Sequence, residues 1–107
     1  MSNAKKPRLL SDSELERVAR HFKLLGEPVR LKILQAVCRG PRTVTQIVAA
    51  ASATQANVSK HLALLAAAGI LTRKKDGQRV YYALKDQLTL ELCELVHAHA
   101  GGKSASR

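Results

Sequence analysis

The sequence predicts one small α+β domain that contains five helices and one β-hairpin. Its length of 107 residues corresponds to a single domain. Apolar residues recur at spacings of three and four along most of the chain, which indicates helices. Two strand-like segments, 70–75 and 78–84, flank the dipeptide Asp76-Gly77, which is a strong hairpin signal.

We expect the domain to span residues 11–100. Residues 1–10 are basic and aperiodic, which predicts a disordered arm, and the Gly- and Ser-rich residues 101–107 predict a flexible tail. The sequence contains no apolar run of about 18 residues, so we expect no membrane partner, and the basic N-terminus lacks the apolar segment of an export signal. We therefore expect a cytoplasmic protein in which Cys38 and Cys93 are free thiols.

Capping residues predict where the helices begin and end. Ser11 and Glu14 form the capping-box pattern of a first helix, and Gly26 ends it. Pro28 suits the first turn of a second helix, where its missing N–H would have no partner. The remaining three helices are expected to begin near Thr43–Gln46, after Thr54 and after Asp86, the last two ending near Ala68 and Ala100.

Apolar stripes predict which helix faces are buried. On the second helix Leu31, Leu34 and Cys38 fall on one stripe, so we expect Cys38 to be a small buried side chain. The first helix has one apolar face, formed by Leu15, Val18, Phe22 and Leu25.

The fourth helix combines a buried stripe with a polar outer side. Val58, Leu62 and Leu65 are expected to face the interior, because helical residues advance by about 100° each. The opposite side carries small and polar residues, namely Ala56, Asn57, Ser59, Lys60 and Ala63.

A short helix, a tight turn and this fourth helix suit the major groove of double-stranded DNA. Gln55 and Asn57 can pair with adenine, Ser59 with a base or a phosphate, and Lys60 with a phosphate or guanine. The small side chain of Ala56 allows the backbone to approach DNA closely. The alternative is a polar face that is only solvated.

The charge of the chain favours a polyanionic partner. Lys and Arg number 18 against 8 Asp and Glu, a net charge of +10. The low aromatic content of 3% argues against stacking on single-stranded bases, so double-stranded DNA is the expected partner. The hairpin region carries Arg73, Lys74, Lys75, Arg79 and Lys85 against Asp76.

A basic hairpin after a helix pair describes a winged helix-turn-helix. The hairpin cations would bind the phosphate backbone; alternatively, they only protect an exposed strand edge from aggregation. The expected DNA-binding residues are Thr54, Gln55, Ala56, Asn57, Ser59, Lys60, His61, Arg73, Lys74, Lys75, Gln78 and Arg79. A winged helix used as a protein-interaction module is another possibility, and it would need no basic hairpin.

Three segments resemble the arsenical-resistance repressor family, the ArsR/SmtB type. Residues 25–34 resemble its second-helix signature, residues 54–65 its recognition helix, and residues 69–84 its wing. The resemblance covers roughly residues 14–100. It implies a homodimeric bacterial repressor that dimerises through the first and fifth helices and is released from its operator by an effector.

The resemblance also implies operator contacts by Gln55, Ser59 and His61. On the helical wheel, His61 lies between the inner and outer sides of the fourth helix. A hydrogen-bonded histidine at the boundary of the core is therefore an equal alternative to a DNA contact.

Two metal sites occur in relatives of this kind, and neither is complete here. A Cys-x-Cys pair near the third helix is replaced by residues 44–46, which lack a thiol, and only Asp86 and His99 fit the fifth-helix pattern. Zinc normally takes four ligands, so we expect no family-type zinc site and no cofactor. His99 otherwise lies on an apolar face with Leu88 and Leu92, as an interface histidine.

Cys38, Cys93 and His97 are candidate sensor residues. Cys93 and His97, four residues apart, could bind a metal, and Cys38 with Cys93 could form a dithiol switch. The effector class therefore stays open between a small molecule, a metal and a thiol-reactive compound. A thiol enzyme using Cys93 and His97 would need an orienting third group and an oxyanion site, so we expect no enzyme.

Overall fold

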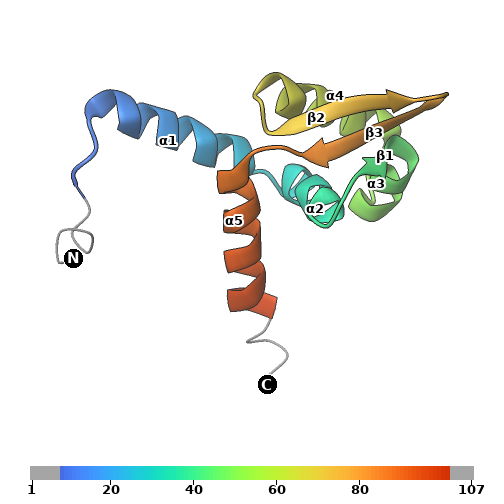
Figure 1. Cartoon of the computed structure of the whole chain (residues 1–107). Helices are drawn as coiled ribbons and strands as arrows, with labels where there is room; N and C mark the ends of the chain where they lie inside the picture. The colour runs from blue at the N-terminus through green and yellow to red at the C-terminus, as the bar shows by residue number, and fades with distance from the viewer. Residues whose placement is uncertain (1–7, 102–107) are drawn as a thin grey trace.

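The computed structural model describes residues 8–101, so residues 1–7 of the expected arm and 102–107 of the expected tail lie outside the described residues. The five helices and the hairpin are confirmed (Figure 1). In chain order the elements are α1 (Asp12–Leu25), α2 (Pro28–Val37), β1 (Arg42–Thr43), α3 (Val44–Ala51), α4 (Gln55–Ala67), β2 (Leu71–Asp76), β3 (Arg79–Leu84), α5 (Gln87–Val96) and a π-helical segment, His97–Gly101.

The helix starts follow the capping residues. Ser11 Oγ accepts a hydrogen bond from the Glu14 backbone N–H at 3.2 Å, and the Glu14 carboxylate accepts one from the Ser11 N–H at 2.9 Å. This capping box satisfies two N–H groups that the first helical turn leaves without partners. Thr43 and Gln46 form a second box at α3, and the Thr54 hydroxyl caps α4.

The sheet has one strand more than the sequence predicts. Residues 42–43 form the short strand β1, which pairs with Tyr81 and Tyr82 and gives the order β1-β3-β2. The hairpin turn is also shifted by one residue, to Gly77-Gln78, because Asp76 pairs with Arg79. Gly77 takes a φ of +65°, which glycine adopts without strain in the first position of such a turn.

The buried face of α2 differs from the expected one. Ile33, Leu34 and Val37 are buried, whereas Leu31 is 49% exposed and Cys38 is only half-buried. The expectation of a fully buried Cys38 is therefore wrong. Both stripes contain Leu34, and the packing of α2 on α3 and α4 selects the one that turns Ile33 inward.

The outer helices are less buried than the centre. Figure 1 shows α1 and α5 extending away from the body that the other elements form. No residue of α1 is buried, and Thr89 is the buried residue of α5. Among the described residues, no helix is both long enough and apolar enough to span a membrane.

Candidate nucleic-acid interface

The helix α4 is fixed by its inner face and by the turn before it. Val58, Leu62 and Leu65 lie in the core, as the sequence predicts. Ser52 closes α3 in the left-handed region, with a φ of 52°, and the chain then turns within three residues to the N-cap Thr54. The α3–α4 pair is thus a helix-turn-helix whose second helix shows only its outer side to solvent.

Most of the expected α4 contact residues face solvent. Asn57 is half-buried and therefore less exposed than Gln55. The exposed positions are Thr54, Gln55, Ala56, Ser59, Lys60 and Ala63. Amide, hydroxyl and ammonium groups in this arrangement can donate to or accept from base edges and phosphates.

His61 is separated from this exposed set. It is only 6% exposed, and its Nδ1 accepts a hydrogen bond of 3.1 Å from the Arg30 Nε. Its Nε2 lies 3.9 Å from the Glu27 Oε1. The structure therefore favours the boundary-histidine alternative over a direct DNA contact. No local spacing signals this contact, because Arg30 and His61 are 31 positions apart.

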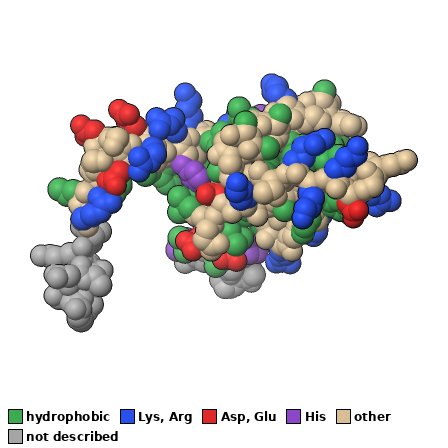
Figure 2. Space-filling model, turned by 45° about the horizontal axis from the view of Figure 1, so that its top comes forward, with side chains coloured by type: hydrophobic (Ala, Val, Ile, Leu, Met, Phe, Trp, Pro, Cys, Tyr) green, Lys and Arg blue, Asp and Glu red, His purple; other side chains and the backbone are tan. Residues whose placement is uncertain are grey.

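The hairpin places cations on both of its faces. Directly opposed residues share a face, so Arg73 lies beside Tyr82 on the core side of the sheet, and Lys74 lies beside Tyr81 on the other side. None of the hairpin cations has a carboxylate within 4 Å in residues 8–101. The exposed polar side chains here are Arg73, Lys74, Lys75, Gln78 and Arg79. Figure 2 shows Lys and Arg side chains gathered over this end of the molecule and along α1.

The two candidate thiols lie at the C-terminal cap of α2 and within α5. The Cys38 Sγ donates to the Gln35 carbonyl at 3.3 Å, and the half-buried Cys93 packs against the core. Burial raises the pKa of the Cys93 thiol, and the charges of Cys38 and Glu94 raise it further. Both cysteines are free, and His97 is exposed at the start of the π-helical segment.

Asp86 has a structural role at the start of α5. Its Oδ2 accepts from the Thr89 backbone N–H at 3.0 Å and from the Thr89 hydroxyl at 2.6 Å. The Thr89 hydroxyl also contacts the His21 Nε2 at 3.1 Å, which links α5 to α1. His99 is exposed, and nowhere in residues 8–101 do three or more ligating side chains gather as a metal site would require.

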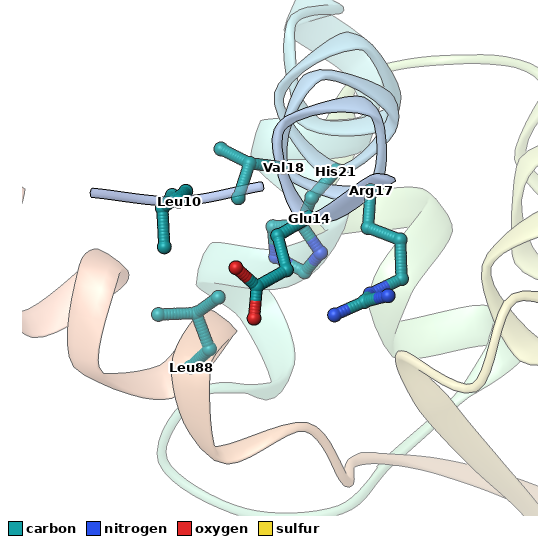
Figure 3. A pocket seen from close by; sticks show the side chains of 6 residues that line it. All are labelled: Leu10, Glu14, Arg17, Val18, His21 and Leu88. Atoms are coloured by element: carbon teal, nitrogen blue, oxygen red, sulfur yellow. The ribbon is translucent and has the colours of Figure 1, made fainter. Parts of the chain in front are cut away.

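A shallow hollow of about 290 Å³ lies between α1 and the start of α5 (Figure 3). Its apolar wall consists of Leu10, Val18 and Leu88. Glu14 and Arg17 extend from α1 toward it. The hollow shares Val18 with the exposed apolar side of α1, so the two form one continuous surface.

Comparison with known proteins decides the family. The family model for the bacterial regulatory proteins of the arsR family matches residues 27–73. The probable mercury resistance operon repressor of Streptomyces lividans is 35% identical over 88 residues, which cover 82% of this chain and 70% of the relative. The chain belongs to the ArsR family. The expected function as a DNA-binding transcriptional repressor, rather than an enzyme, is thereby confirmed.

Solved structures agree with this ArsR-family fold. The AntR antimony-specific transcriptional repressor superposes with a TM-score of 0.85 at 27% identity, covering 98% of this chain and 96% of its own. The homodimeric winged helix-turn-helix DNA-binding domain Mb0332 of Mycobacterium bovis has a TM-score of 0.74 at 29% identity, covering 92% and 94%. The winged helix-turn-helix prediction is confirmed.

Proposed function

We propose that this ArsR-family chain is a cytoplasmic homodimeric repressor whose two α4 helices enter successive major grooves of an inverted-repeat operator. The observation that carries the proposal is the packing of α4, whose outer side is polar and exposed, against strand β2 of the cationic hairpin. A two-fold dimer would present two such surfaces about 34 Å apart, which is one turn of B-DNA.

Sequence would be read by the exposed side of α4. Gln55 can form two hydrogen bonds with adenine, and Ser59 and Lys60 reach a base or the adjacent phosphate. The short side chain of Ala56 leaves space for the base edges. His61 would act indirectly, by fixing α4 through Arg30.

Affinity would come largely from the hairpin. Its cations lie on both faces near the turn at Gly77-Gln78, so they can reach phosphates on either side of an inserted hairpin tip. Such contacts release counterions and carry no sequence information, which makes binding strongly dependent on salt.

Exposed apolar side chains support dimerisation through α1 and α5. Phe22 is 59% exposed and Leu95 is 64% exposed, and an isolated domain of this size gains much by covering such groups. The same surface includes Leu15, Val18, Leu88 and Val96. The homodimeric state of the Mb0332 domain supports the same arrangement.

Derepression requires an effector that binds better to a conformation unable to bind DNA. A redox sensor is a second candidate function, because the chain holds two free and half-buried thiols, Cys38 and Cys93. Hydrogen peroxide would accept two electrons from the two thiols, forming one S–S bond and two water molecules. The test is intact mass spectrometry of peroxide-treated protein after alkylation, with Cys38→Ser as the control. A disulfide would leave neither thiol free for alkylation, whereas retention of both free thiols would exclude the switch.

The proposed function is tested by native mass spectrometry combined with binding to a random-sequence duplex over a range of salt concentrations. We expect a dimer whose binding constant falls steeply with salt. A chain that remains monomeric, or that ignores duplex DNA at physiological ionic strength, would favour the protein-interaction module instead.

A further inference from the structure

A second cationic surface lies apart from the hairpin. An open groove of about 640 Å³ runs between α1 and the C-terminal end of α4. Its lining contains no acidic side chain. Four cations line it above apolar atoms of Leu24 and Ile70: Arg17, Arg20, Lys23 and Arg30. Within residues 8–101, no side-chain nitrogen of these four residues lies within 4 Å of a carboxylate oxygen, although the Arg30 backbone N–H donates to the Glu27 carboxylate at 3.1 Å.

Arg30 is held in place at this groove. Its Nε donates to His61, and its Nη1 donates to the Leu24 carbonyl at 2.9 Å. The Nη2 has no hydrogen-bond acceptor among the described residues. A guanidinium fixed in this way loses little entropy on binding an anion, and its planar N–H groups match the oxygens of a phosphate.

The groove would remain open in the proposed dimer. At about 100° per residue, Arg17, Arg20 and Lys23 centre roughly 180° away from the apolar stripe that contains Val18 and Phe22. A partner subunit that covers the apolar stripe therefore leaves Arg20 and Lys23 exposed, whereas Arg17 also lines the hollow beside Leu88.

The groove and the hairpin border α4 from opposite directions. Figure 1 shows α1 and the hairpin tip extending to opposite sides of the helix pair. Ala68, in the groove, lies nine residues after Ser59, which places it about 14 Å further along the helix axis and about 180° around the axis from Ser59. The major groove is about 12 Å wide between its two backbones, so a helix lying in it has phosphates within reach on both sides.

We propose that the groove between α1 and α4 binds phosphodiester groups of the DNA backbone, on the side of α4 away from the hairpin. The inference rests on the proposed function, because it requires α4 to lie in the major groove. It adds Arg17, Arg20, Lys23 and Arg30 to the DNA-binding surface. A free phosphate-containing ligand would satisfy the same chemistry, and the experiment distinguishes the two sources.

The test compares two doubly substituted full chains, each of which loses two positive charges. Arg20→Ala with Lys23→Ala alters the groove, whereas Lys32→Ala with Arg39→Ala removes two exposed cations outside it. Duplex binding is measured over a range of salt concentrations, after circular dichroism shows that both variants fold. We expect the groove variant to lose about 0.9 of salt slope per lost phosphate contact, or about 3.6 for the four contacts that the two subunits of the dimer lose, with the control close to wild type. Equal slopes in the groove variant and the wild type would overturn the proposal.

Inorganic pyrophosphate serves as the free-ligand probe. If pyrophosphate raises the Tm of the wild type but not that of the groove variant, while the DNA salt slopes stay equal, the groove binds a free anion and the backbone proposal is wrong. If the wild type itself fails to bind duplex DNA, the proposed function fails. If the wild type binds duplex DNA and the groove variant binds it with the same salt slope, the groove proposal fails while the proposed function stands.

Discussion

The Nε of Arg30 donates a hydrogen bond to the Nδ1 of His61 across 3.1 Å, and this contact ties the first turns of α2 to the middle of the recognition helix α4. Arg30 also donates a hydrogen bond from its Nη1 to the Leu24 carbonyl in the last turn of α1. One side chain therefore joins α1, the proposed dimerisation helix, to α4, the proposed DNA-binding helix. A movement of α1 against α2 would strain a contact of α4.

Replacing His61 should reduce stability. His61→Ala leaves the Arg30 Nε without its acceptor in a partly buried position, which costs about 1–3 kcal/mol of unfolding free energy. Urea unfolding measures the loss, and Lys60→Ala, next in sequence but exposed, should stay within about 0.5 kcal/mol of wild type. If His61→Ala instead keeps full stability but loses operator affinity, the histidine contacts DNA directly.

Substitutions on the exposed side of α4 should affect specificity. Gln55→Ala or Ser59→Ala removes a base contact, so discrimination between operator and random duplex should fall by about 1–3 kcal/mol. Competition binding against a sequence selected from a random duplex pool measures the ratio. A loss of equal size on both duplexes would assign the residue to the backbone.

Removing a hairpin cation should weaken binding to every sequence. Arg79→Ala is expected to lower affinity on operator and random duplex alike and to reduce the salt slope by about 1.8, because each subunit of the dimer loses one phosphate contact. Arg39→Ala, an exposed cation away from the hairpin, is the matched control. An unchanged slope for Arg79→Ala would place the hairpin outside the interface.

The capping box of α1 should survive to low pH. The Arg8 guanidinium, and after it the Ser11 backbone N–H, lower the pKa of Glu14 to about 2. A carboxylate whose pKa is lower in the folded state stabilises the fold above its ordinary pKa and loses that contribution as the pH falls through the folded value. The Ser11 amide resonance should therefore titrate near pH 2, and Glu14→Gln should abolish the transition. A midpoint near the ordinary value of 4.5 would show that the pair with Arg8 does not form in solution.

Local chemistry accounts for the features that sequence could predict. Ser11 and Thr54 cap helices through contacts three residues away, and the stripe of Val58 and Leu62 lies within one helix. The presence of a hairpin could be predicted from its glycine. Its register could not, because the pairing of the two strands decides which residues form the turn.

Long-range packing accounts for the features that were missed. The strand β1 exists only because Arg42 and Thr43 pair with residues some 40 positions away. The buried face of α2 depends on the helices packed against it, and the environment of His61 depends on Arg30. The groove of Arg17 and its neighbours likewise combines α1, α2 and the end of α4.

Hydroxyl-radical footprinting of the dimer on its selected operator tests the central claim most directly. Two α4 helices in successive major grooves predict two protected segments on one face of the duplex, about 10 base pairs apart from centre to centre. A single protected segment, or two segments on opposite faces of the duplex, would contradict the proposed mode of binding.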